Sequence, residues 1–180
     1  QPPRPPRLLL CSLFDGIGGA AQALRLLGLS PQVHIVVELD AAARRCVRAN
    51  HQVWREYDDV HAIHEHDVRH WAVSHGHDID LVLLVAGFPC VDLSSLKHSR
   101  QGLDGPESGL VYEAVRIHSL LSKFFPNVVR LFENVESMHE AERQRITDLL
   151  HLPPIMVDAA TVSHCRRPRL YWVDSLALSG

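Results

Sequence analysis

A glycine-rich turn near the start of the chain is the feature that most restricts its fold. Residues 8–14 (LLLCSLF) form a short apolar run, which predicts a buried strand, and residues 15–19 (DGIGG) follow it directly. Alanines and leucines at helical spacing then occupy residues 20–27, and Gly28 ends the predicted helix. A strand, a glycine turn and a helix in this order open a nucleotide-binding βαβ unit, whose glycines let the backbone approach a ligand. Because residues 15–19 contain only part of the usual glycine motif, a tight turn without a ligand is the alternative.

The next apolar run, residues 34–37, ends in an acidic residue. Glu38 follows the glycine turn at about the 20-residue spacing at which an acidic side chain binds the ribose hydroxyls of a nucleotide cofactor. Asp40 is expected to cap a helix over residues 41–49. The pair Asp67-Val68 is expected to follow a third strand and to lie at the same edge of the sheet. We therefore predict that Glu38 binds a ribose.

Another apolar run, residues 81–85, leads to a candidate nucleophile. The strand predicted there breaks at Gly87-Phe88-Pro89, and Cys90 follows just past its carboxyl end. In open α/β sheets ligands bind at this edge, and Pro89 stiffens the corner before the cysteine. Cys90 is therefore a candidate nucleophile. The alternative is a small buried hydrophobic residue, which is what most free cysteines are.

The segment after Cys90 has the composition of a loop. Residues 94–108 are rich in serine and glycine, which predicts a mobile segment with hinges at its glycines. Basic residues in this segment would suit a polyanionic substrate if Cys90 is reactive, although ordinary surface charge explains them almost as well.

Two further predicted strands are accompanied by side chains suited to catalysis or binding. A buried strand over residues 128–132 is followed by Glu133, whose carboxyl group could donate or accept a proton in a shared pocket; helix capping by Glu133 or Asn134 is the alternative. Residues 155–157 and 170–173 are predicted to form a final pair of strands. Residues 166–169 (RRPR) come immediately before the second of these, and arginines are rigid donors suited to carbonyl or phosphate groups.

These segments alternate strand and helix along the chain, with further helices predicted over residues 110–125 and 140–150. The alternation predicts an α/β fold with a Rossmann-like, mostly parallel sheet and an antiparallel strand pair at its C-terminal end. A length of 180 residues suits one domain, which we expect at residues 8–180, after a proline-rich tail at residues 1–7.

Charge and residue spacing exclude several classes of protein. The formal net charge of −3 gives no basic face, so a nucleic-acid substrate would have to be held by a local cluster or by another chain. The cysteines form no CxxC pair, and the histidines between residues 61 and 77 lack ligand spacing, so we predict no metal site. We find neither a run of membrane-spanning length nor a signal peptide, and we expect a soluble intracellular protein that does not bind membranes.

In their order and spacing, these motifs resemble those of the DNA (cytosine-5)-methyltransferase family. The matching segments are FDGIGG at 14–19, Glu38, DV at 67–68, FPCVDLS at 88–94, ENV at 133–135 and RPRLYW at 167–172. The residues PCVDLS before a long loop, and MVDAATVS before the two arginines, are most similar to the eukaryotic de novo DNA methyltransferase branch. The tRNA-methylating branch differs after its Pro-Cys pair and is the second choice.

The resemblance implies a Rossmann-like methyltransferase that transfers a methyl group from S-adenosylmethionine to carbon 5 of cytosine in DNA. Cys90 would form a covalent adduct with a flipped-out base, Glu133 would contact ring nitrogen 3, and Arg167 and Arg169 would orient the base and the catalytic loop. The loop residues Ser94, Lys97 and Arg100 would contact DNA. The cofactor would be bound by Phe14, Asp15, Gly16, Ile17, Gly18, Gly19, Glu38, Asp67, Val68, Gly87, Pro89 and Leu110.

Two features depart from the family pattern. The sequence ends soon after RPRLYW, before the DNA-reading region and the last cofactor motif of the family, and Val91 stands where many bacterial members carry glutamine. One expectation is therefore the catalytic part of a DNA methyltransferase, completed by further sequence or by a partner chain and nuclear if the source is a eukaryote. The other is a homologue that does not methylate but binds and regulates an active relative. A Cys–His hydrolase would leave Glu38, the glycine turn and the arginines without a role.

Overall fold

A seven-stranded sheet runs through this computed structural model, which describes residues 4–89 and 109–174. The strands are β1 (Leu8–Leu13), β2 (Val33–Val37), β3 (Arg55–Tyr57), β4 (Leu81–Gly87), β5 (Val128–Val135), β6 (Ile155–Asp158) and β7 (Pro168–Val173), and they lie in the order β3-β2-β1-β4-β5-β7-β6. Strands β1 to β5 are parallel, whereas β7 runs antiparallel to both β5 and β6. The predicted mostly parallel α/β sheet with a C-terminal antiparallel pair is confirmed.

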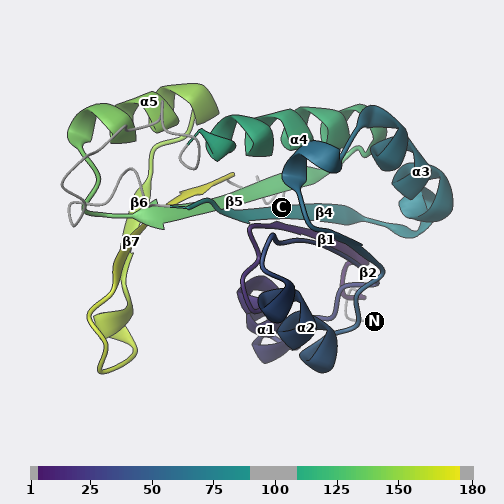
Figure 1. Ribbon diagram of the computed structural model, residues 1–180, viewed down its shortest axis with the longest axis horizontal. Helices are drawn as coiled ribbons and strands as arrows, with labels where there is room; N and C mark the ends of the chain where they lie inside the picture. Colours follow the sequence, from purple (N-terminus) through teal and green to yellow (C-terminus); the bar gives the residue numbers. More distant parts are fainter. Residues whose placement is uncertain (1–3, 90–108, 175–180) are drawn as a thin grey trace.

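Helices cover both faces of the sheet (Figure 1). On one face, α1 (Gly19–Leu26) and α2 (Ala41–Asn50) lie beside β1 and β2, whereas α3 (Glu65–His75), α4 (Leu110–Phe124) and α5 (Glu140–Leu150) lie along the other. Short 3₁₀ helices occur at Val60–Ala62 (η1), Gly76–Asp78 (η2) and Ala159–Thr161 (η4). Within the two described ranges, no helix is long and apolar enough to cross a membrane.

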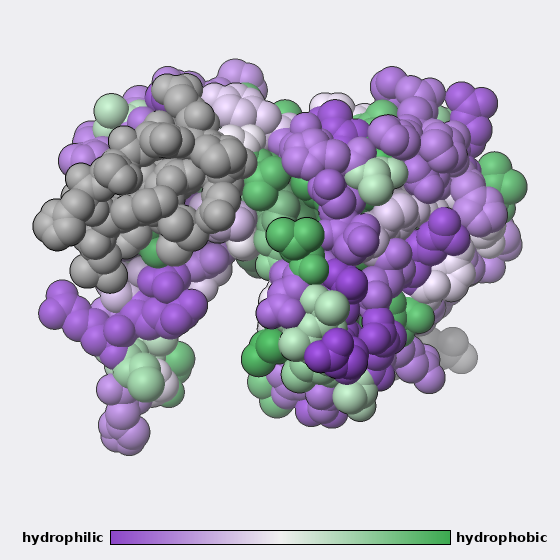
Figure 2. Space-filling view, viewed as in Figure 1, coloured by the Kyte–Doolittle hydropathy of each residue, from purple (hydrophilic) through white to green (hydrophobic). Residues whose placement is uncertain are grey.

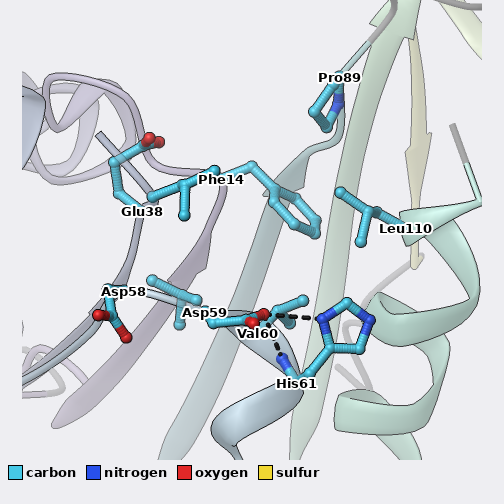
Figure 3. Close-up of a pocket in the computed structure, with 10 residues that line it drawn as sticks. Phe14, Glu38, Asp58, Asp59, Val60, His61, Pro89 and Leu110 are labelled. Atoms are coloured by element: carbon cyan, nitrogen blue, oxygen red, sulfur yellow. Dashed lines mark hydrogen bonds and ion pairs between the residues drawn. The ribbon is translucent and has the colours of Figure 1, made fainter. Parts of the chain in front are cut away.

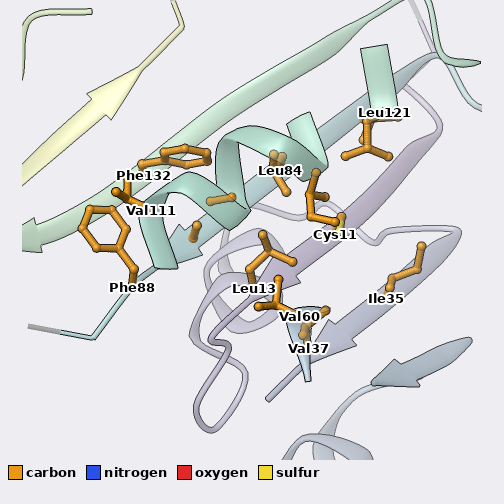
Figure 4. Close-up of a cluster of buried hydrophobic side chains, with 14 of the residues drawn as sticks. Cys11, Leu13, Ile35, Val37, Val60, Leu84, Phe88, Val111, Leu121 and Phe132 are labelled. Carbon is orange, nitrogen blue, oxygen red and sulfur yellow. The ribbon is translucent and has the colours of Figure 1, made fainter. Parts of the chain in front are cut away.

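Strand β1 lies at the centre of the hydrophobic core. All of its residues are buried, as expected for a parallel strand covered on both faces. Cys11 lies among the core side chains that contact α4 (Figure 4), and burial raises the pKa of its thiol to about 12. On the other face, Leu8 and Leu10 pack against Ala21 and Leu24 of α1. Cys11 is therefore a packing residue and not a reactive thiol.

Specific side chains fix strand β7 against its neighbours. Trp172 is fully buried, and its indole N–H donates a hydrogen bond to Thr147 Oγ1 of α5 at 3.1 Å. Just past the strand, the Asp174 carboxylate accepts from the Arg130 guanidinium of β5 at 2.7 Å. These contacts fix the antiparallel register that pairs Tyr171 of β7 with Glu133 of β5.

The predicted elements outside residues 51–80 agree closely with those in the structure. The histidine-rich residues 61–77 contain α3, whose Trp71 is fully buried. The proline-rich N-terminal tail is bound to the sheet near its end. The Arg7 N–H donates to Asp80 Oδ2 at 2.9 Å, and the Arg7 guanidinium lies 2.7 Å from Asp78 Oδ1.

Candidate active site

A cavity of about 420 Å³ lies at the carboxyl ends of β1, β2 and β4. This is the edge at which ligands bind in open α/β sheets, and the volume falls within the usual range for small-molecule sites. Figure 3 shows apolar side chains on one side of the cavity and acidic groups on the other. Its lining residues are Phe14, Val37, Glu38, Leu39, Asp58, Asp59, Val60, His61, Pro89 and Leu110.

The glycine turn shapes the end of β1 next to this cavity. Gly16 and Gly18 have φ angles of 57° and 91°, in the left-handed region that favours glycine. A Cβ atom at Gly18 would also lie 3.0 Å from the His51 ring. The turn closes with a hydrogen bond from the Gly18 N–H to the Asp15 carbonyl at 3.1 Å and leads into α1. Backbone geometry alone therefore explains glycine at both positions.

Backbone donors on both sides hold the Glu38 carboxylate in place. Its Oε2 accepts from the Gly16 N–H at 2.8 Å, and its Oε1 accepts from the Asp40 N–H at 2.9 Å. Asp40 also caps α2, because its side chain accepts from the Ala42 N–H at 2.7 Å. Each carboxylate oxygen has a second lone pair. Glu38 is thus oriented and able to accept from two further donors, such as a pair of hydroxyl groups.

The acidic wall of the cavity comes from the residues directly after β3. Asp59 caps η1 and accepts from the backbone N–H and the ring of His61, at 2.9 and 2.7 Å (Figure 3). These hydrogen bonds hold the pKa of Asp59 below its usual range. Asp58 and Val60 line the cavity on either side of Asp59.

Asp67-Val68, expected to follow a third strand at the edge of the sheet, lies in a helix further along the chain than the end of that strand. Strand β3 ends at Tyr57, and Asp67 lies in the first turn of α3. There its carboxylate accepts from the His64 N–H at 2.9 Å and from the Tyr57 hydroxyl at 3.0 Å. Val68 is fully buried in the core. This Asp-Val pair stabilises the start of α3, and the corresponding place at the sheet edge belongs to Asp59 and Val60.

A second cavity of about 620 Å³ shares Phe14 with the first and lies on the α1 face of the sheet. Helix α1 and strands β4 and β5 give it apolar walls. Two of its polar residues, Ser12 and Asp15, belong to β1 and the turn after it. The others are Glu133 of β5, Tyr171 of β7 and Arg167, which precedes β7.

Glu133 is held by an arginine of the neighbouring strand. Its Oε1 lies 2.7 Å from Nε of Arg169. Burial raises the pKa of Glu133 above its usual value, although the positive charges of Arg169 and Arg167 oppose this shift. Gly87 is the register partner of Glu133 on β4, and a Cβ atom there would lie 3.3 Å from Glu133 Oε2. The carboxyl group therefore lies between the Arg169 guanidinium and the backbone of Gly87, which has no side chain.

Asn134, next to Glu133, holds the corner that precedes Cys90. Its side chain is buried, and its Nδ2 donates to the Phe88 carbonyl at 3.1 Å. Its own Oδ1 accepts from the Val135 N–H at 2.7 Å. Asn134 thus links the end of β5 to the backbone just before Pro89, and helix capping does not describe its role.

Asp15 is a half-buried acid of the second cavity. Its Oδ2 is shielded from solvent and has no hydrogen-bond partner among the described residues. Burial raises its pKa to about 6; the Ser12 hydroxyl opposes this shift and the negative charge of Glu38 adds to it. A cationic group in the cavity would compensate this unpaired oxygen.

The structure thus gathers most of the predicted site residues into two adjoining cavities. Phe14, Glu38, Pro89 and Leu110 line the first, and Phe14, Asp15, Gly19, Gly87, Glu133 and Arg167 line the second. Gly16 and Arg169 contact the site through Glu38 and Glu133. The remaining predicted residues within the described ranges line neither cavity; they are Ile17, Gly18, Asp67 and Val68. The predictions for Cys90, Ser94, Lys97 and Arg100 fall outside the described residues.

Together, the sheet and its helices define a Rossmann-like α/β domain with a cavity at the carboxyl edge of its strands. The chain matches the family of C-5 cytosine-specific DNA methylases over residues 8–151, and it belongs to that family. The family predicted from the sequence motifs is therefore confirmed.

Relatives in plants agree with this assignment, and a solved fungal structure shares the fold. The rice DNA (cytosine-5)-methyltransferase DRM2 is 34% identical over 116 residues, which cover 59% of this chain and 18% of that protein. The Arabidopsis thaliana enzyme DRM1 is 32% identical over 124 residues, covering 65% and 19%. The crystal structure of the S. pombe Dnmt2 methyltransferase superposes with a TM-score of 0.68 at 18% identity, covering 97% of this chain and 52% of that one. The plant relatives lie in the eukaryotic branch that the motifs indicated, and the matches span about a fifth of their length.

Proposed function

We propose that this chain forms the cofactor-binding and catalytic part of a DNA cytosine-5 methyltransferase that uses S-adenosylmethionine. The observation that carries the proposal is the pair of adjoining cavities. One is acidic and of nucleoside size, and the other contains Glu133, with Arg169 bound to it and Arg167 beside it. Cys90 follows Pro89 of the first cavity in the sequence. In a eukaryotic cell this activity belongs in the nucleus.

The charges around the first cavity favour a cofactor without phosphate groups. Its described walls carry three carboxyl groups and neither lysine nor arginine, so a dinucleotide phosphate would meet repulsion. S-adenosylmethionine has a nucleoside and two positively charged groups but no phosphate. Glu38 would hold its ribose hydroxyls, and Phe14 and Leu110 would pack against its adenine. Asp15 supplies a buried oxygen suited to the cationic end.

Each proposed residue has a defined part in the chemistry. The bound cofactor supplies an electrophilic methyl group, which passes to carbon 5 of cytosine and leaves S-adenosylhomocysteine. The Cys90 thiolate adds to carbon 6, which makes carbon 5 nucleophilic. A protonated Glu133 donates to ring nitrogen 3 and so stabilises the adduct. A base then removes the carbon 5 proton, the bond between Cys90 and carbon 6 breaks, and the proton at nitrogen 3 returns to Glu133. The ring double bond and the thiolate are thereby restored.

A covalent trapping experiment tests the proposal directly. A DNA duplex with 5-fluorocytosine at the target should form a covalent complex with the chain when S-adenosylmethionine is present, because fluorine at carbon 5 cannot be removed as a proton. Cys90→Ser should form no such complex. Saturable cofactor binding without trapping by the wild-type chain would overturn the catalytic proposal and would favour a homologue that only binds.

Replacing Glu38 by alanine should weaken S-adenosylmethionine binding about 10- to 50-fold. The change removes two charge-assisted acceptors for the ribose hydroxyls and frees the Gly16 N–H, which together are worth about 2 kcal/mol. Calorimetric titration measures the affinity, and a thermal melt reports whether the fold persists. Glu65→Ala on α3 is the control, because it removes an exposed, ion-paired carboxylate of the opposite face. Equal affinity in wild type and Glu38→Ala would exclude Glu38 from the cofactor site.

Replacing Gly87 by alanine should slow methyl transfer about 10-fold without lowering stability. The new Cβ, 3.3 Å from Glu133 Oε2, forces the carboxyl group to move by a few tenths of an ångström. The fold tolerates the change, because Gly87 lacks a positive φ angle and alanine restricts the unfolded chain. Single-turnover methylation and urea unfolding measure the two effects. Gly76→Ala is the matched control, because its Cβ would meet only ordinary contacts beyond 3.6 Å. Unchanged turnover in Gly87→Ala would show that Glu133 tolerates displacement.

A further inference from the structure

The hairpin formed by β6, β7 and residues 159–167 projects from the body of the molecule (Figure 1). It leaves the sheet at the end that carries Glu133 and Arg169, and in Figure 2 much of its surface is hydrophilic. Strand β6 of this hairpin contributes little to the core, because its Ile155, Met156 and Val157 are all exposed.

The turn at the tip of this hairpin has a defined structure. Asp158 caps η4, and its Oδ1 accepts from the Ala160 N–H at 3.0 Å and from the Arg167 N–H at 2.8 Å. The Ser163 hydroxyl donates to the Ala159 carbonyl at 2.9 Å and accepts from the Cys165 N–H at 3.2 Å. The tip therefore presents its side chains from a fixed backbone, so its backbone loses little conformational entropy on binding.

Two successive arginines of the tip take different positions. Arg167 lines the cavity that contains Glu133. The side chain of Arg166 is 87% exposed, and within residues 4–89 and 109–174 it is paired with the Asp158 carboxylate at 3.9 Å. Positive charge is thus concentrated beside the second cavity, in a chain whose formal net charge is −3. Such a local cluster is what a polyanion requires of an otherwise acidic chain.

We propose that this hairpin tip binds the sugar-phosphate backbone of DNA next to the target cytosine, with Arg166 contacting a phosphate. The inference rests on the proposed function, which puts the flipped base in the cavity beside Glu133 and Arg167. A nucleotide whose base enters that cavity carries its own phosphates to the rim. Arg166 is the residue before Arg167 and its side chain is exposed. Arginine is well suited to phosphate because of its planar fork of donors.

The salt dependence of DNA binding tests this contact. Fluorescence anisotropy with a labelled duplex, without cofactor, gives the dissociation constant of the full chain from about 50 to about 200 mM salt. Removing one phosphate contact lowers the slope of log affinity against log salt by about 0.9. Arg166→Ala should therefore bind more weakly than wild type at low salt, and its deficit should shrink about 3-fold across this range. Arg166→Lys should keep the wild-type slope.

Arg69→Ala is the matched control for the loss of an exposed arginine. Arg69 is 65% exposed, has one carboxylate partner at 3.4 Å, and lies on α3 at the far end of the sheet (Figure 1). An unchanged slope in Arg166→Ala, or an equal change in Arg69→Ala, would overturn the hairpin contact while leaving the proposed function intact. Absence of DNA binding by the wild-type chain would also overturn the hairpin contact. Cofactor titration and covalent trapping would then test the proposed function separately.

Discussion

Replacing Glu133 by glutamine is expected to slow methyl transfer about 10²- to 10³-fold. Glutamine has nearly the same size, but it cannot carry an acidic proton to ring nitrogen 3. It also loses the charge that holds Arg169 at 2.7 Å. Single-turnover methylation at saturating S-adenosylmethionine measures the effect on the step itself. Glu136→Gln is the matched control, because Glu136 is an exposed carboxyl group three residues further along the chain.

The pH dependence separates a proton donor from a structural acid. Burial raises the pKa of Glu133, so the protonated fraction persists to higher pH than for an ordinary glutamate. If the protonated form is the active one, the wild-type rate falls as pH rises through that pKa, and the Glu133→Gln variant lacks this limb. A wild-type rate in the variant, with Cys90-dependent trapping retained, would contradict the assigned role.

The fold was largely predictable because the central strands are continuous apolar runs. Strands β1 and β4 are runs of hydrophobic residues, so both can be recognised as strands from the sequence without knowing which strands they pair with. Strand β3 is different, because it has three residues, two of them charged. Glu56 is tolerated there because Arg44 and Arg48 of α2 lie 3.0 and 2.6 Å from its oxygens. That compensation comes from a neighbouring helix, so the local sequence does not indicate a strand.

Because the local sequence does not indicate β3, the Asp-Val pair at the edge of the sheet could not be identified from the sequence. The sequence contains two Asp-Val pairs, at residues 59–60 and 67–68, and either one follows residues that could form a strand. Only the pairing of β3 with β2 brings the first pair to the edge that carries Glu38. The aromatic and β-branched residues of the segment 53–57 (VWREY) were the available signal. Ser12 and Tyr171 were also missed, because their place in the second cavity depends on strand register.

Replacing Asp15 by asparagine is expected to stabilise the protein at neutral pH and to weaken cofactor binding. The raised pKa, about 6 instead of 3.8, means that the folded state holds the charged form unfavourably, by up to about 3 kcal/mol. The contribution of Asp15 to stability is therefore least unfavourable below about pH 4 and becomes more unfavourable as pH rises through about 6. Asparagine has no such dependence. The variant should gain between about 1 and about 3 kcal/mol at pH 7 and nothing at pH 4, as measured by urea unfolding.

Cofactor affinity should change in the opposite direction, because the unpaired Asp15 oxygen lies where a cationic group would compensate it. Calorimetric titration at neutral pH should show about 10-fold weaker binding of S-adenosylmethionine by Asp15→Asn. The wild-type affinity should decline as pH falls through about 6, whereas that of the variant should stay flat. Asp148→Asn, on the surface of α5, should change neither quantity. A variant that is more stable yet binds the cofactor as tightly as wild type would show that Asp15 does not face the cationic end. A stability gain together with lost binding would identify Asp15 as a destabilising residue kept for its role in the site.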